Sequence, residues 1–510
     1  MSEPQPHPST LDPTAVDAAS LLRESLLADG SALSRPWVAA EMFEYDGELD
    51  LTALQNAADA LIARHQALRD TFHHGGDGWE QRIRRPRPAV VHHVTEGSHV
   101  CLEPFDMSVG PFLRVILESR VDHAPLLCLE VAHFVADGLS LSTLFDELGQ
   151  LYGAFARQEQ PQLPAVPQPG DFARHQRKEL TPARREQICG DWAAKLRGSI
   201  IPVFDRPRSP DAAPDTGVIT RALEPTLLRS LRAAARQHDT TLPILAFHCY
   251  TRALATVTGH HEVVFDTPFS GRGGSYTRLV DNLANVMPLR LRADLPLSES
   301  LAAIREQLLA ATESELLPFH EVEAALDGRL DPSTDLSQMS FFSVWQHSVL
   351  RLPGLRVKPA PHRPQGNALA LQSCSTFLQL DEHEGRVVSV FDRNCAEPTT
   401  VESLLDVLIE TAHGLARESG GGASAAHHDV PTTPPNPFES AQDDFVVLVN
   451  ADRQFSLWPA RLAVPTGWTV EHGGDRAACL SYVDDAWQDM RPVRLIAGAT
   501  PANGAHHGNR

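Results

Sequence analysis

The pattern of apolar positions predicts an amphipathic helix near the start of the chain. Between Leu51 and Phe72, apolar residues recur at helical spacing. They are Leu51, Leu54, Ala58, Leu61 and Ile62. The turn that begins at Gly47 ends on Asp50, which suits an N-cap, so we expect the helix to start there.

A strand, a loop and a second helix are predicted further along. The run Leu126–Ala132 is β-prone and mostly apolar, as a buried strand is. Ser140 stands in an N-cap position before the helical run Leu141–Leu151. Strands and helices alternate again from residue 263 onward. The predicted fold class is therefore α/β, or α+β.

Length and changes of composition divide the chain. A chain of 510 residues is too long for one core, and a Gly- and Pro-rich stretch follows Arg417. We expect a disordered N-terminus at 1–14, two large lobes at 15–175 and 176–417, a flexible linker at 418–435, a small domain at 436–496 and a disordered tail at 497–510.

Charge and composition exclude several kinds of partner. A formal net charge of −21 repels a phosphate backbone, so nucleic acid is not expected. No run approaches the ~18 apolar residues of a membrane span, and the N-terminus lacks a basic start and an apolar run. We therefore expect a cytoplasmic protein without a membrane partner. Seven scattered cysteines without a CxxC pair argue against disulfides and against a metal site.

Candidate chemistry lies directly after the predicted strand 126–132. His133 is followed by Asp137 and Gly138 in a His-x-x-x-Asp-Gly pattern. A neutral imidazole can take a proton from a nucleophile near pH 7, and a carboxylate paired with an arginine can hold the loop. The spacing alone is a weak signal, because a histidine at a strand end is more often a packed or capping residue.

The His-x-x-x-Asp-Gly pattern is one of a series of segments in a fixed order. The others are Arg64–Phe72, Phe105-Asp106 with Gly110–Arg114, Asp171–Ala173, Asp205–Arg208, Thr267–Arg272, Asn285–Arg290, Leu317–Phe319 and Asp335–Phe342. In this order they make the chain resemble the condensation domains of nonribosomal peptide synthetases, from about Asp17 to Leu415.

This resemblance implies a fold and a reaction. The fold would be a V-shaped pseudo-dimer of two chloramphenicol-acetyltransferase-like lobes with a tunnel between them. Phosphopantetheine arms of peptidyl or acyl carrier proteins would deliver a donor thioester and an acceptor amine. The chain would act as an acyltransferase that forms an amide bond, and it would bind no cofactor of its own.

The resemblance also assigns residues. His133 becomes the central catalytic histidine, Asp137 the carboxylate that holds the loop, and Gly138 the residue that allows close approach of the backbone. It implies a structural salt bridge between Asp137 and Arg290, which would keep the carboxylate ionised.

Two further features of the first domain bear on the site. Ala132 stands where the family has a first histidine that supports the loop. Trp345 and His347 are candidates to face the tunnel, although a packed strand aromatic is an equally good interpretation.

The C-terminal segment carries a second resemblance. Its series is Asn436–Glu439, Phe445–Asn450, Gln454–Pro459, Val464–Trp468 and Leu480–Pro492. Together these segments resemble the MbtH-like proteins, which implies a three-stranded antiparallel sheet with a helix that binds and activates an adenylation domain. The candidate contact residues are Ser456, Leu457, Trp458 and Trp468.

The leading hypothesis is a free-standing condensation enzyme fused to a binding module for an adenylation domain. No adenylation segment and no carrier motif is evident, so we expect other chains to supply both. Two alternatives stay open. One is ester formation or transfer to a soluble acceptor, and the other is a non-catalytic recruitment platform, which Ala132 favours.

Overall fold

The structure is a computed structural model in which the chain forms two compact units, Met1–Ala423 and Ser424–Arg510. It describes residues 20–29, 38–75, 78–95, 105–209, 213–272, 276–326, 330, 334–360, 372–381, 384–420, 445–450, 455–460, 464, 468–475, 478–479 and 482. The predicted disordered ends and residues 421–435 of the predicted linker lie outside these ranges.

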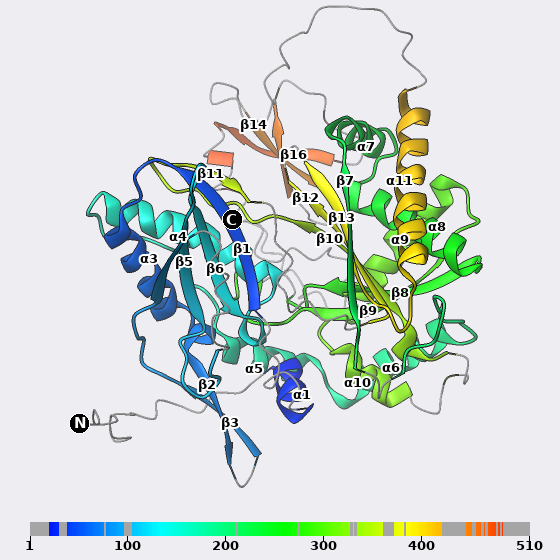
Figure 1. Cartoon of the computed structure of the whole chain (residues 1–510), viewed down its shortest axis with the longest axis horizontal. Coiled ribbons are helices and arrows are strands. Elements are labelled where there is room, and N and C mark those ends of the chain that lie inside the picture. Colours follow the sequence, from blue (N-terminus) through cyan, green and yellow to red (C-terminus); the bar gives the residue numbers. More distant parts are fainter. Residues whose placement is uncertain are drawn as a thin grey trace, which may run out of the picture. The chain divides into compact units, whose positions relative to one another are not determined.

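The first lobe of the large unit is built on a five-stranded sheet (Figure 1). In spatial order its strands are β11 (Arg356–Pro359), β1 (Val38–Asp46), β6 (Leu126–Ala132), β5 (Leu113–Ser119) and β4 (Val90–Thr95). Only β4 and β5 run parallel within this sheet. Helices α3 (Leu51–Arg64) and α4 (Gly138–Ala156) pack against it and bury a shared apolar core.

The predicted start of α3 is confirmed and its predicted end is wrong. The Asp50 side chain accepts a hydrogen bond from the Ala53 backbone N–H at 2.9 Å, as an N-cap does. The helix ends at Arg64 because His65 has an extended backbone, and a 3-10 turn, Gln66–Arg69, follows. The predicted extension to Phe72 instead enters a β-hairpin.

The second lobe is built on a six-stranded mixed sheet. In spatial order its strands are β7 (Thr216–Leu223), β13 (Gly385–Asp392), β12 (Cys374–Leu380), β10 (Ser340–Gln346), β8 (Glu262–Phe269) and β9 (Asn285–Arg292). Helices α7 (Pro225–Gln237), α8 (Leu242–Thr258), α9 (Leu297–Thr312) and α11 (Pro398–Gly420) gather on one side of it (Figure 1). Helices α6 (Pro182–Leu196) and α10 (Phe319–Leu326) form a separate core with Val264 and Met287.

Short elements complete the large unit. They are α1 (Leu21–Asp29), the hairpin β2 (Asp70–Gly75) and β3 (Gly78–Ile83), α5 (Pro169–Glu179), and the 3-10 turns η3 (His133–Val135) and η5 (Leu336–Gln338).

The chain does not divide between the lobes at a single residue. The predicted boundary at residue 175 falls inside α5, and α11 continues to Gly420, beyond the predicted start of the linker. Strand β11 lies within the segment expected to form the second lobe, yet it pairs with β1 of the first, with Phe43 opposite Pro359. A returning segment of the second half therefore completes the sheet of the first lobe.

The small unit contains a three-stranded antiparallel sheet, as expected. Its order is β15 (Phe455–Pro459), β14 (Phe445–Asn450) and β16 (Trp468–Gly474). Phe445, Val447, Val449 and Cys479 form its buried core. Most of the expected helix lies outside the described residues.

The α/β fold class with two lobes is thus confirmed, because each lobe has its own sheet, helices and core. In the described part of the chain, no helix is long and apolar enough to cross a membrane.

Candidate functional site

The loop that carries His133 is fixed at both ends by regular structure. Strand β6 ends at Ala132, His133 opens the 3-10 turn η3, and α4 begins at Gly138. The N-cap of α4 is Asp137, whose side chain accepts a hydrogen bond from the Ser140 backbone N–H at 3.0 Å. The predicted N-cap at Ser140 is therefore wrong by three positions, because the aspartate reaches the free N–H of the first turn.

Arg272 of the second lobe forms a salt bridge with Asp137 of the first lobe. Its Nη1 and Nη2 lie 2.7 Å from Asp137 Oδ2 and Oδ1 respectively, in a two-point contact. The backbone N–H of Leu283 donates a third hydrogen bond to Oδ2 at 3.0 Å. The loop of His133 is thereby clamped to the segment that follows β8.

These contacts decide the charge of Asp137. Burial by itself would raise the pKa of this carboxyl, since it removes water from the charged form. The charge and hydrogen bonds of Arg272, with the N–H groups of Leu283 and Ser140, outweigh burial and hold the pKa below its ordinary value. Asp137 is thus an ionised structural carboxylate, which makes it unsuitable as a proton carrier.

The predicted partner of Asp137, Arg290, is wrong. Arg290 lies within β9, and its guanidinium contacts the Glu262 carboxylate at 2.8 Å. It also donates to the backbone carbonyls of Lys195 and Arg197 at the end of α6. Arg290 occupies the strand position opposite Val264 on β8, which turns its side chain toward α6 instead of the first lobe.

Ser140 and the backbone of Asp281 extend the contact between Arg272 and Asp137, here called the clamp. Ser140 Oγ lies 3.0 Å from Asp137 Oδ1 and 2.8 Å from the backbone carbonyl oxygen of Asp281. The same carbonyl accepts a hydrogen bond from Arg272 Nη2 at 2.9 Å. The position of the Asp281 backbone is therefore coupled to that of the His133 loop.

A second arginine, Arg23 of α1, holds the Asp281 side chain in a buried charged cluster. Arg23 is paired with the carboxylate of Asp281 and, at 3.2 Å, with that of Asp70 on β2. Gln81 of β3 bridges the cluster, accepting from Arg23 and donating to Asp70. All of these side chains are buried.

The charged cluster and the clamp together hold more buried carboxylates than buried arginines. Burial raises the pKa of Asp70 to about 7 and that of Asp281 to about 6, although Arg23 opposes both shifts. Repulsion between the Asp70 and Asp281 anions contributes to the raised pKa of Asp70. Three buried carboxylates, those of Asp70, Asp137 and Asp281, thus meet the buried guanidinium groups of Arg23 and Arg272. This excess favours keeping one carboxyl protonated near neutral pH.

His133, Gly138 and Ala132 differ in exposure. The His133 side chain is half-buried, and Gly138 is exposed. Apart from its neighbours in the same helix, no described residue has an atom within 4 Å of the place where a Cβ of Gly138 would stand. The described part of the chain therefore leaves open space at Gly138, and a close approach of a substrate there stays a prediction. Ala132 is only 2% exposed and packs in the core of the first lobe, so its side chain supports the strand end from inside.

Trp345 and His347 lie at another contact between the lobes. Their rings are 4.7 Å apart, and His347 Nδ1 is 3.7 Å from the buried Glu41 carboxylate of β1. Ser348 donates to the same carboxylate from its backbone and its hydroxyl, at 2.8 and 2.7 Å. These contacts give the segment a joining role, and a tunnel-facing role for the two rings stays a prediction.

The candidate contact residues of the small unit are divided between two faces. Leu457 pairs with Val447 across β14 and β15 and packs against the buried core. Because side chains alternate along a strand, Ser456 and Trp458 share the opposite face. Trp468 begins β16, opposite Asn450.

The sequence alone assigned no role to Arg272, Arg23 or Asp281. Arg272 stands at the end of the motif Thr267–Arg272, directly after a glycine that follows a strand, which is where a side chain can leave the sheet. Asp281 is a charged residue directly after the apolar pair Leu279 and Val280, a weak signal of a buried ion pair. Arg23 gave no signal in the sequence.

Comparison with known families places the chain. The condensation domain family matches residues 27–349, more than half of the chain, and the MbtH-like protein family matches residues 434–499. The chain therefore belongs to the condensation domain family, whose members are acyltransferases, and it carries an MbtH-like domain. Both predicted resemblances are confirmed.

Its curated relatives are much longer synthetases. Chondramide synthase cmdD of Chondromyces crocatus is 28% identical over 391 residues, which cover 71% of this chain and 10% of that protein. Phosphinothricin tripeptide synthetase PhsC of Streptomyces viridochromogenes is 29% identical over 399 residues, covering 72% and 36% respectively. The chain thus spans well under half of these relatives.

Solved structures support the fold. The first condensation domain of the CDA synthetase is similar with a TM-score of 0.67 and 17% sequence identity. The similarity covers 80% of this chain and 98% of that domain, so both lobes are included.

Proposed function

We propose that the large unit forms an amide bond between an acyl thioester, held on the phosphopantetheine of a carrier protein, and an amine acceptor. The observation that carries the proposal is the two-point contact of Arg272 with Asp137, which holds the loop of His133 between the two lobes. A positioned imidazole beside ionised, unreactive neighbours suits acyl transfer.

In this mechanism the amine nitrogen attacks the thioester carbonyl carbon. A C–N bond forms and the C–S bond breaks, so that the thiol of phosphopantetheine leaves. His133 accepts the proton that the nitrogen loses and returns it to the departing sulfur. Asp137 takes no part in this transfer because Arg272 keeps it ionised.

Gly138 contributes space in this mechanism. Its exposed position at the first turn of α4 leaves room for a substrate beside the backbone, where any larger residue would project a side chain. Trp345 and His347 are proposed to border the tunnel next to Glu41.

The decisive experiment mixes the chain with donor-loaded and acceptor-loaded carrier proteins and follows both by intact-protein mass spectrometry. We expect loss of the acyl group from the donor carrier and an equal gain on the acceptor, dependent on His133. No transfer by the wild-type chain with any carrier pair of its pathway would contradict the proposal and favour recruitment. Once the product has been released from its carrier thioester, a newly formed bond that mild base cleaves would identify an ester instead of an amide.

We also propose that the MbtH-like domain binds an adenylation domain through the face of β15 that carries Ser456 and Trp458. The support for this assignment is that Leu457 packs on the core of the unit, whereas Ser456 and Trp458 lie on the other face of the same strand. Trp468 is proposed to extend the contact from β16.

A further inference from the structure

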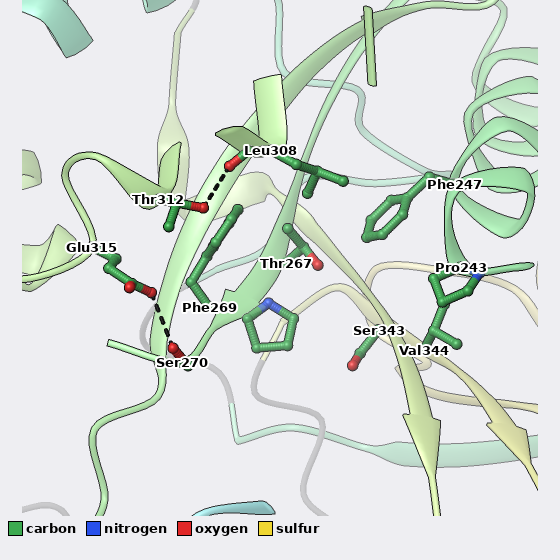
Figure 2. A pocket seen from close by; sticks show the side chains of 11 residues that line it. Pro243, Phe247, Thr267, Phe269, Ser270, Leu308, Thr312, Glu315, Ser343 and Val344 are labelled. Atoms are coloured by element: carbon green, nitrogen blue, oxygen red, sulfur yellow. Dashed lines mark hydrogen bonds between the residues drawn. The ribbon is translucent and has the colours of Figure 1, made fainter. Parts of the chain in front are cut away.

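A separate pocket of about 340 Å³ lies in the second lobe, between strands β8 and β10 and helices α8 and α9 (Figure 2). Much of its wall is apolar, with Phe247, Phe269 and Leu308 among the lining side chains. Its volume falls within the ~300–1,000 Å³ usual for small-molecule sites. None of the residues assigned to the proposed condensation reaction lines it.

Glu315 gives this pocket an acidic end. The residue is 8% exposed, and its Oε2 accepts hydrogen bonds from the Gly271 backbone N–H at 3.0 Å and the Ser270 hydroxyl at 3.2 Å. Within the described part of the chain, no lysine or arginine forms a salt bridge with Glu315, and its Oε1 accepts no hydrogen bond.

Glu315 is largely buried and forms no salt bridge within the described residues, and a carboxylate with little access to water gains from a partner of opposite charge. A ligand that brings a cation into the pocket would supply that partner. A primary ammonium has three N–H donors, enough for a free carboxylate oxygen and a neighbouring hydroxyl together.

The lining residues are arranged in two groups. In Figure 2, Glu315, Ser270 and Thr312 lie on one side of the Phe269 side chain. Phe247, Pro243 and Val344 lie on the other side, together with the hydroxyl-bearing side chains of Thr267 and Ser343. A ligand with a charged head and a short apolar body would match both groups at once.

We propose that this pocket binds a small primary ammonium compound with a compact apolar or aromatic group, with its nitrogen at Glu315. The site belongs to the second lobe alone and requires neither a carrier protein nor His133. Its occupancy can therefore be measured without the proposed condensation reaction.

The choice of variants follows from the contacts of Glu315. Glu315→Gln removes the charge but keeps an oxygen that can accept from the Gly271 N–H, next to Arg272. Glu313→Gln is a matched control, since Glu313 is exposed on the same helix end. Thr312→Trp places a large side chain at an exposed position that lines the pocket. It should fill the pocket while leaving the Glu315 carboxylate in place.

The test measures binding of phenethylamine to the full chain by calorimetry, with 2-phenylethanol as the uncharged probe. We expect the wild type and Glu313→Gln to bind the amine more tightly than the alcohol, and Glu315→Gln to bind the amine about tenfold or more weakly. Thr312→Trp should bind neither probe. Equal binding of the two probes to the wild type, undiminished amine binding by Glu315→Gln, or no binding to the wild type would overturn the proposal.

Discussion

Arg272 and Asp137 lie 135 positions apart in the chain and form a two-point contact with both N–O distances at 2.7 Å. Both side chains are almost fully buried. The pair joins the loop after a strand of the second lobe to the N-cap of α4 in the first. The geometry of the His133 loop therefore depends on how the two lobes meet.

Breaking this pair should destabilise the chain strongly. We expect Asp137→Asn or Arg272→Gln to lower the free energy of unfolding by about 3–5 kcal/mol, since each leaves a buried charge alone. The double variant should lose less than the sum of the two. Chemical denaturation gives the coupling energy, and Arg290→Gln serves as control because its bridge to Glu262 is partly exposed. If the losses in free energy of unfolding from the two single variants were additive in the double variant, Asp137 and Arg272 would not be paired.

Removing the imidazole should affect rate and leave the fold intact. We expect His133→Ala to slow condensation by ~10²–10⁴-fold, the usual contribution of a positioned acid or base. Mass spectrometry of the carriers measures the rate, and thermal unfolding checks the fold. His123→Ala is the control, since His123 lies exposed in a turn between two strands of the same sheet. Full activity of His133→Ala would make the residue structural only.

Filling the position of Ala132 should be unfavourable. The residue is 2% exposed within the core of the first lobe, so Ala132→His, which restores the family pattern, adds a ring where there is packing. We expect a loss of about 1–3 kcal/mol in the free energy of unfolding. Ala132→Ser, a much smaller change, should cost less. Unchanged stability of Ala132→His would mean that the loop can open to take the ring.

The charged cluster of Arg23, Asp70 and Asp281 predicts a pH dependence of stability. The pKa of Asp70 is raised to about 7 and that of Asp281 to about 6, so the folded chain keeps a proton that the unfolded chain has released above its ordinary carboxyl pKa. This contribution is fully present below the ordinary carboxyl pKa of about 4, declines as the pH rises, and is lost above about pH 6 to 7. Its slope approaches about 1.4 kcal/mol per pH unit for one proton.

The comparison that isolates this effect uses Asp70→Asn. Denaturation at a series of values from about pH 5 to about pH 8 should show a smaller decline for this variant than for the wild type. Asp46→Asn, at an exposed position on β1, should follow the wild type. If the free energies of unfolding of Asp70→Asn and of the wild type changed with pH in parallel, the charged cluster would not hold the extra proton.

The two faces of β15 predict opposite effects for neighbouring residues. Trp458→Ala should weaken binding of an adenylation domain from the same pathway by about 2 kcal/mol, or roughly thirtyfold, without unfolding the unit. Leu457→Ala should instead lower its melting temperature, because Leu457 packs on the core. Calorimetry of the full chain measures both quantities. If Trp458→Ala and Leu457→Ala lost binding and stability to the same extent, the assignment of one face of β15 to binding and the other to the core would be wrong.

The sequence by itself determined the local elements of the fold. The cap at Asp50, the apolar strand Leu126–Ala132 and the His-x-x-x-Asp-Gly pattern depend on short-range rules of capping, alternation and turn chemistry. The series of motifs also identified the condensation domain family and the presence of the MbtH-like domain. A series of short motifs in a fixed order can be recognised without knowing which residues contact each other.

Only the tertiary structure decided which distant groups meet. Arg272 and Arg290 were both arginines in second-lobe motifs, and the direction in which a side chain leaves its strand selected the first. In the same way, β11 joined the sheet of the first lobe, and Arg23 reached Asp70 and Asp281. Charges buried between the lobes need partners of opposite charge, and those partners come from segments far apart in the sequence. Short-range sequence patterns cannot predict which of these segments pack together.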